Sequence, residues 1–160
     1  MNAAHLHLIT NHIPIIGLFC GLFVLICGMV SKNKSVLTIS MLLIALCSAG
    51  GMVANKSGEE AEDTVEQIAG ISKSAIHEHE EAAEAAVPFI LLSFVFSATG
   101  LFLHRKNHKW AGIANILLLV VCLLACSLSA RAGWLGGKIR HQAEIGAIQP
   151  AMHHDEKDHD

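Results

Sequence analysis

The chain has 160 residues, of which 52% are hydrophobic and 16% are charged, and its formal net charge at pH 7 is −3. The charged fraction is well below the roughly 25% of soluble domains, and the apolar residues are gathered in long runs, which is typical of a membrane protein. The sequence contains no phosphate-binding loop and no nucleic-acid-binding signature. Its motifs therefore exclude a nucleotide-binding protein of the phosphate-loop class and a nucleic-acid-binding protein.

The first half of the sequence predicts a hairpin of two membrane-spanning helices. Residues 13–30 carry no charged side chain and are long enough to cross a bilayer, as are residues 36–54. The short polar turn at 31–35 makes the two helices antiparallel. Gly17 and Gly21 form a GxxxG pair, which allows close helix approach and offers a face for oligomerisation.

The second half predicts another hairpin, preceded by an acidic segment. Residues 55–75 hold spaced Val and Ile side chains and predict a short amphipathic surface helix, with a flexible loop as the alternative. Two further spans follow at 87–103 and 110–130. The predicted fold class is an all-α, integral membrane four-helix bundle over residues 1–145, with a disordered tail rich in His and acids at 146–160.

Charge is segregated along the chain and predicts its orientation in the membrane. The turns at 31–35 and 104–109 hold five Lys or Arg and no acid, whereas residues 55–86 hold nine acids and two lysines. The positive-inside rule then puts both turns in the cytoplasm. We expect a multi-pass protein of a bacterial inner membrane with both termini in the periplasm.

The two halves resemble each other and predict an internal repeat. Each consists of a helix with a proline near its start, a short basic turn and a second helix that leaves the membrane through small residues. The segment 48–51 (SAGG) resembles the segment 129–133 (SARAG).

Three histidines are predicted to meet at the periplasmic surface, one from each of three spans. His12 precedes the first span, His79 lies about one turn before the third, and His141 follows the fourth. At 100° per residue, His79 shares a face with apolar residues, whereas His77 falls among the acids. His79, with His12 or His141, is therefore the preferred ligand pair.

Haem b is the first predicted cofactor. Imidazole is a common axial ligand of haem iron, and helical bundles build cofactor sites from facing side chains. Lys138 and Arg140 stand beside His141 and are predicted to hold the haem propionates. Bis-histidine iron has no open coordination position, so the expected chemistry is one-electron transfer rather than catalysis, and no catalytic residue is predicted.

A bare metal ion is the alternative cofactor. The three histidines with Glu81 and Glu144 are ligand types that suit Zn, Mn, Fe or Cu. The segment 77–81 (HEHEE) is not the HExxH motif of zinc proteases, because its fifth position is Glu81.

Three short segments resemble a known family. The sequence HIPI at 12–15 resembles the His-Phe-Pro-Ile signature of a family of uncharacterised bacterial four-helix membrane proteins, which occur alone or joined to c-type cytochrome domains. HEEAA at 79–83 and GGKIRH at 136–141 are similar to members of the cytochrome-associated branch. Ile13 stands where the family usually has Phe, and the chain has no Cys-x-x-Cys-His motif. The resemblance implies a respiratory, haem-linked role.

The sequence therefore predicts a membrane b-type cytochrome-like electron carrier. Its expected partners are the lipid membrane and a c-type cytochrome or other subunits of a respiratory complex. The alternatives are a non-haem metal protein that uses the same His and Glu residues, and an accessory structural subunit of a larger membrane complex.

Overall fold

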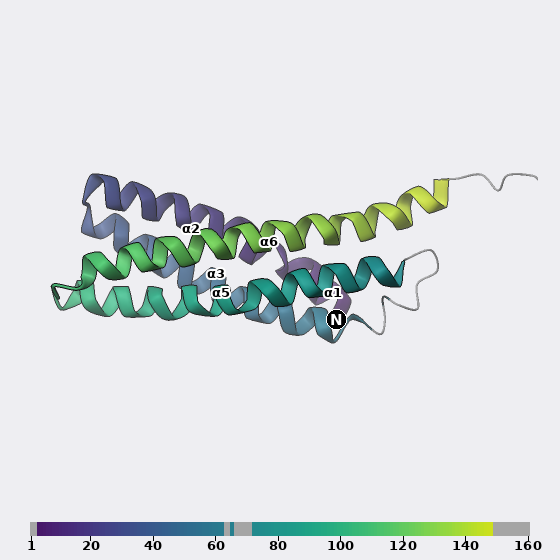
Figure 1. Ribbon diagram of the computed structural model, residues 1–160, viewed down its shortest axis with the longest axis horizontal. Helices are drawn as coiled ribbons and strands as arrows, with labels where there is room; N and C mark the ends of the chain where they lie inside the picture. The colour runs from purple at the N-terminus through teal and green to yellow at the C-terminus, as the bar shows by residue number, and fades with distance from the viewer. Residues whose placement is uncertain (1–2, 63–64, 66–71, 149–160) are drawn as a thin grey trace, which may run out of the picture.

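The computed structural model describes residues 3–62, 65 and 72–148, and every regular element within them is an α-helix (Figure 1). Four stretches are long and apolar enough to cross a membrane: His5–Ser31, Lys34–Glu59, Lys73–Arg105 and Ala111–Ile139. The predicted all-α fold with four membrane-length helices is confirmed, and it indicates a multi-pass membrane protein. In chain order the helices are α1 (Ala3–Thr10), α2 (His12–Ser31), α3 (Lys34–Glu59), α5 (Lys73–Arg105) and α6 (Ala111–Ile148).

The helices are longer than the predicted spans because the polar, alanine-rich flanks also form helix. Helix α5 begins at Lys73, long before the predicted start at 87, and continues through Pro88. The predicted separate surface helix at 55–75 is corrected at both ends. Its first residues belong to α3 and its last to α5, while residues 63–64 and 66–71 lie outside the described residues. The predicted tail at 146–160 also lies largely outside them.

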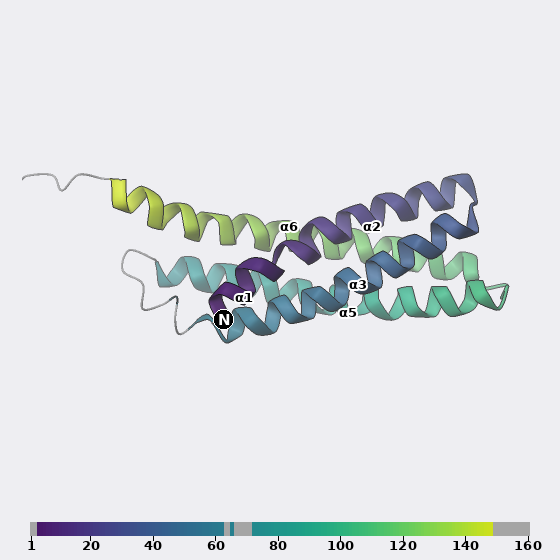
Figure 2. The same cartoon turned by 180° about the vertical axis from the view of Figure 1, so that it is seen from behind.

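The two short turns lie at the same end of the bundle (Figures 1 and 2). In the first turn, Lys32 adopts a left-handed backbone conformation and the Asn33 side chain caps α3 by accepting hydrogen bonds from two backbone N–H groups. The Nζ atom of Lys34 donates to Oδ1 of Asn107 in the second turn over 2.7 Å. The opposite end, which carries α1 and the start of α5, is called the histidine end below.

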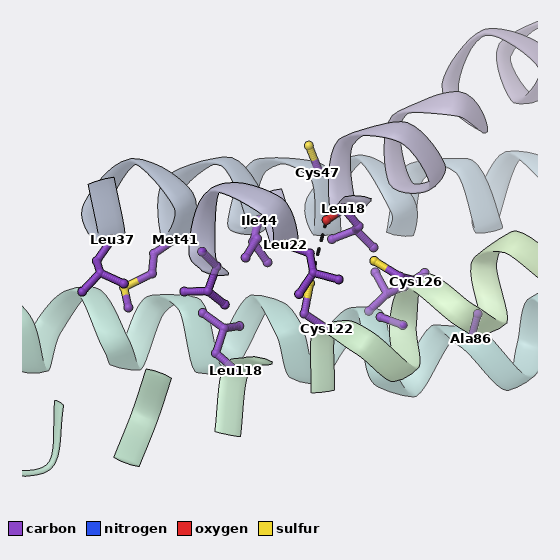
Figure 3. Close-up of a cluster of buried hydrophobic side chains, with 13 residues drawn as sticks. Leu18, Leu22, Leu37, Met41, Ile44, Cys47, Ala86, Leu118, Cys122 and Cys126 are labelled. Carbon is purple, nitrogen blue, oxygen red and sulfur yellow. Dashed lines mark hydrogen bonds between the residues drawn. The ribbon is translucent and has the colours of Figure 1, made fainter. Parts of the chain in front are cut away.

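The core is a continuous apolar column between the helices (Figure 3). Helix α2 packs on α3, α3 on α5, α5 on α6, and α6 returns to α2, so the four long helices form a closed ring. Cys47, Cys122 and Cys126 lie buried in this core as free thiols, as expected for small apolar packing residues. The outer faces carry large apolar side chains such as Phe23 and Leu46, about 70% exposed, which suit contact with lipid.

Burial follows the same pattern in both hairpins, which supports the predicted repeat. A shift of 72 residues, from Pro14 to Ala86, brings most buried positions of α2 onto buried positions of α5, although Leu22 falls on the exposed Phe94. A shift of 78 residues, from Ala54 to Ala132, does the same for α3 and α6. The matched buried pairs are 14/86, 18/90, 21/93, 25/97 and 28/100 in the first helices, and 40/118, 44/122, 47/125, 51/129, 54/132 and 57/135 in the second.

This register differs from the predicted one by three residues, since Gly51 rather than Ser48 matches Ser129. Because α3 packs on α5 and α6 packs on α2, the contacts between hairpins also come in an equivalent pair. The bundle therefore has an approximate two-fold axis along its length, as in transporters built from parallel repeats.

Candidate functional site

A cavity of about 80 Å³ opens between the helices at the histidine end. It is lined by α1, α2, α3, α5 and α6 and by Asn11 between the first two. Most of its wall consists of small or apolar side chains, and two imidazole rings, those of His7 and His79, contribute polar atoms. Few polar groups in an apolar concave surface are the usual composition of a ligand site.

His7 is held by the second helix of its own hairpin. Its Nδ1 atom lies 2.8 Å from the carbonyl oxygen of Ala54 in α3. Four residues further along the same helix, Gly58 leaves room for the ring, because a Cβ atom there would lie 3.0 Å from Cε1 and Nδ1 of His7. The carbonyl fixes one ring nitrogen and the glycine lets the ring lie close to the helix backbone.

His79 is held in the same way in the second hairpin. Its Nδ1 atom lies 2.9 Å from the carbonyl oxygen of Ala132 in α6. Gly136 follows four residues later, and a Cβ atom there would lie 3.1 Å from Cε1 of His79. The two half-sites thus share one plan, in which a histidine bonds to an alanine carbonyl and rests on the glycine four residues beyond it.

The two rings meet across the approximate two-fold axis. Their centroids are 6.3 Å apart and their planes are inclined at 75°. His7 and His79 are 72 residues apart, which is the repeat shift of the first helices, so they occupy equivalent positions in the two hairpins.

The hydrogen bonds also decide which nitrogen of each ring is available to a ligand. A carbonyl oxygen only accepts, so Nδ1 of each imidazole must carry the proton and donate it. In the neutral ring, Nε2 then keeps its lone pair. A histidine whose other ring N–H is donated to a backbone carbonyl is the usual arrangement of a metal-ligating histidine.

Two further polar atoms line the cavity without a hydrogen-bond partner among the described residues. They are Oδ1 of Asn11 and Oγ of Ser129, which are both buried. Buried polar atoms in folded proteins are nearly always paired with protein, water or ligand. Ser48 and Ser97 are also buried without a partner among the described residues, but they do not line the cavity, whereas Asn11 and Ser129 lie where a bound group could reach them.

The helical phase predicted for α5 is confirmed. His79 is half-buried and lines the cavity, whereas His77 is exposed. The Nε2 atom of His77 lies 3.4 Å from Oε1 of Glu81, four residues further on, and this pair lies on the outside of the bundle. Glu81 is therefore directed away from the cavity.

Of the other predicted site residues, His12 and Lys138 do not line the cavity with His79. His12 is exposed and does not line the cavity. The Nζ atom of Lys138 lies 3.6 Å from the ring centroid of Trp134, an exposed cation–π contact away from the cavity. Arg140, His141 and Glu144 lie in the last part of α6, where their side chains fall outside the described part of the structure.

His7 was not among the predicted ligands, because the first helix was expected to begin at 13. The chain instead forms the short helix α1 before α2, which brings His7 beside α3. The signal that finds it is the repeat register, since matching Leu18 with Ile90 matches His7 with His79. Among the described residues, no group of three or more His, Cys, Asp or Glu side chains could hold a metal ion, so this site offers two imidazoles.

Comparison with protein-family models, with curated proteins and with solved structures finds no match to this chain. The resemblance to the His-Phe-Pro-Ile family therefore stays a prediction.

Proposed function

We propose that this protein binds haem b between His7 and His79 and carries single electrons in a bacterial inner membrane. The ligand pair differs from the one expected from sequence, because His7 takes the position expected of His12 or His141. His79 keeps its predicted role. The distance between the two rings is the observation that carries the proposal.

The ring distance suits two imidazoles on opposite sides of one metal. With nitrogen–metal bonds of about 2.0–2.1 Å and ring centroids roughly 1.1 Å behind the nitrogens, such a pair has centroids about 6.3 Å apart, and a tetrahedral pair about 5.1 Å apart. The observed distance is 6.3 Å. His7 and His79 would then hold the haem iron between them through their Nε2 atoms.

The donor set and the cavity wall also support haem. Both Nε2 atoms are unprotonated in the tautomer set by Ala54 and Ala132, as an axial ligand must be. The cavity wall is built mostly from small and apolar residues, as the faces of a porphyrin require. Side chains of Ile90 and Ile15 fill the space beside Gly51 and Gly133, so a flat ring would have to displace them. When bound, haem would supply a one-electron couple with no open position for substrate.

The proposed orientation follows from the basic turns. Lys32, Lys34, Arg105, Lys106 and Lys109 all lie at the end opposite the two histidines. By the positive-inside rule this end faces the cytoplasm and the histidine end faces the periplasm. The electron partners we propose are a membrane donor and a periplasmic acceptor such as a c-type cytochrome.

A bare metal ion held by the same two imidazoles is the second candidate. The observation in its favour is the pair of unprotonated Nε2 atoms, since imidazole also suits Zn, Cu, Fe and Ni. Water or a partner subunit would have to complete its coordination. A ring pair that binds nothing is the third possibility and would fit an accessory subunit, because edge-to-face rings also pack at 4.5–7 Å.

One experiment separates the three. The protein is purified from cells supplied with haem precursor, and its absorption spectrum and metal content are measured before and after reduction with dithionite. Haem b gives a Soret band and sharp α and β bands on reduction. A stoichiometric metal without these bands favours the second candidate, and neither signal favours the accessory subunit.

A further inference from the structure

We propose that Asn11 and Ser129 form a hydrogen-bonding subsite that binds the carboxyl edge of the ligand and so fixes which way round it lies. This inference rests on the haem site proposed above. It concerns a property that the two histidines cannot supply, because they are equivalent under the two-fold axis and treat both edges of a flat ligand alike.

The polar atoms of the cavity break this equivalence. Under the repeat register, Asn11 matches Ala83 and Ser129 matches Gly51, and all four residues line the cavity. Each polar side chain in one half therefore corresponds to an apolar or absent side chain in the other. The helices and the two histidines around the cavity are nearly symmetric, but the side chains of Asn11 and Ser129, which can form hydrogen bonds, have no polar equivalent.

The two polar residues also lie on one side of the helix ring. Asn11 precedes α2 and Ser129 lies in α6, and these two helices pack on each other. Ala83 lies in α5 and Gly51 in α3, which form the equivalent contact. The opposite wall also carries a polar side chain, Asn55 of α3, but its amide donates a hydrogen bond to Oε1 of Glu59 over 2.7 Å. The cavity-lining polar atoms that lack a partner among the described residues therefore lie on the side of α2 and α6.

Neither polar atom forms a hydrogen bond with another of the described residues. Asn11 has a helical backbone and its N–H bonds to the carbonyl of His7, so its side chain is not needed as a cap and makes no capping hydrogen bond. Ser129 is only 4% exposed, and its hydroxyl has no partner among the described residues. Both atoms are left to a group that enters the cavity.

The chemistry of the pair suits a carboxyl group. The Ser129 hydroxyl donates one hydrogen bond, and the Asn11 amide, whose oxygen and nitrogen exchange places by a 180° rotation, donates another. Haem b carries its two carboxyl groups on one edge and only apolar groups on the opposite edge. Of the two cations predicted for this task, Lys138 has its amine over Trp134, and the side chain of Arg140 lies outside the described part of the structure.

The test compares haem with its dimethyl ester, in which both carboxyl groups are masked. Affinities of the full-length apoprotein for both compounds are measured by titration in detergent, for the wild type, Asn11→Ala/Ser129→Ala and Ser129→Ala. Ser48→Ala is the matched control, since Ser48 is also buried and also lacks a partner among the described residues but does not line the cavity.

We expect the wild type and Ser48→Ala to bind haem about tenfold or more tightly than the ester, the range of hydrogen bonds to a charged group. The double variant should bind both compounds alike, and Ser129→Ala should fall between. Equal binding of haem and ester by the wild type, or an undiminished preference in the double variant, overturns the subsite and leaves the histidine site standing. Failure of the wild type to bind either compound overturns both proposals.

Discussion

The imidazole rings of His7 and His79 face each other across the bundle with their centroids 6.3 Å apart, although 72 residues separate them in the chain. Each ring donates Nδ1–H to a backbone carbonyl of its own hairpin, at 2.8 and 2.9 Å. The pair arises from the repeat. Each hairpin supplies one histidine at an equivalent position, and the two-fold axis brings these two rings together.

Removing either ring should remove the ligand. We expect His7→Ala and His79→Ala each to lower the Soret absorbance per protein at least tenfold, because one imidazole alone leaves the iron with an incomplete axial pair. His12→Ala and His77→Ala are matched controls, since both residues are exposed histidines near the site that do not line the cavity. Loss of the absorbance in His12→Ala but not in His7→Ala would restore the pair expected from sequence.

The glycine beneath His79 should control the position of the ring. In Gly136→Ala the new Cβ would lie 3.1 Å from Cε1 of His79, so the ring must move away from α6. Crowding of this kind costs about 1–3 kcal/mol, which corresponds to a loss of affinity of roughly five- to 150-fold. A Cβ atom added at Gly137 would have nothing within 4 Å, so Gly137→Ala should bind haem like the wild type. Similar affinities for the two variants, measured by haem titration, would mean that the ring is not held against this helix.

Close packing between α2 and α3 should depend on Gly28. A Cβ atom there would lie 2.9 Å from the backbone nitrogen of Leu37, which cannot swing aside as a flexible side chain can. We expect Gly28→Ala to destabilise the folded protein by about 1–3 kcal/mol and to lower the midpoint of thermal unfolding in detergent. Gly112→Ala, with open space around it, serves as the control. An unchanged midpoint in Gly28→Ala would show that the hairpin is less tightly packed than described.

The orientation of the bundle can be read from reporter fusions. Alkaline phosphatase, which is active only in the periplasm, should be inactive when fused after Asn107 and active when fused after Ser74. The expectation follows from the basic residues that flank both short turns. Activity in the first fusion and none in the second would put the histidine end in the cytoplasm and exclude a periplasmic electron acceptor.

Sequence reasoning predicted the parts of this fold that depend on local composition. Apolar runs gave the four spans, and helical phase gave the inward position of His79, because both follow from short stretches of chain. The ends of the helices were missed, since polar alanine-rich residues such as those after Lys73 form helix without an apolar signal.

The pairing of His7 with His79 could not be predicted from the same local signals. His7 reaches the site because α1 ends at Thr10 and a separate helix starts at His12, a break that no periodicity marks. The carbonyl of Ala54 and the space above Gly58 are contributed by residues about 50 positions away. Only the repeat in its correct register, with Gly51 matched to Ser129, carries this long-range information in the sequence.

The most direct test of the central claim is the absorption spectrum of the purified wild-type protein, recorded oxidised and after reduction with dithionite. We expect one haem b per chain, seen as a Soret band that sharpens and shifts on reduction together with resolved α and β bands. A spectrum without these bands, from folded protein made in cells that supply haem, would contradict it.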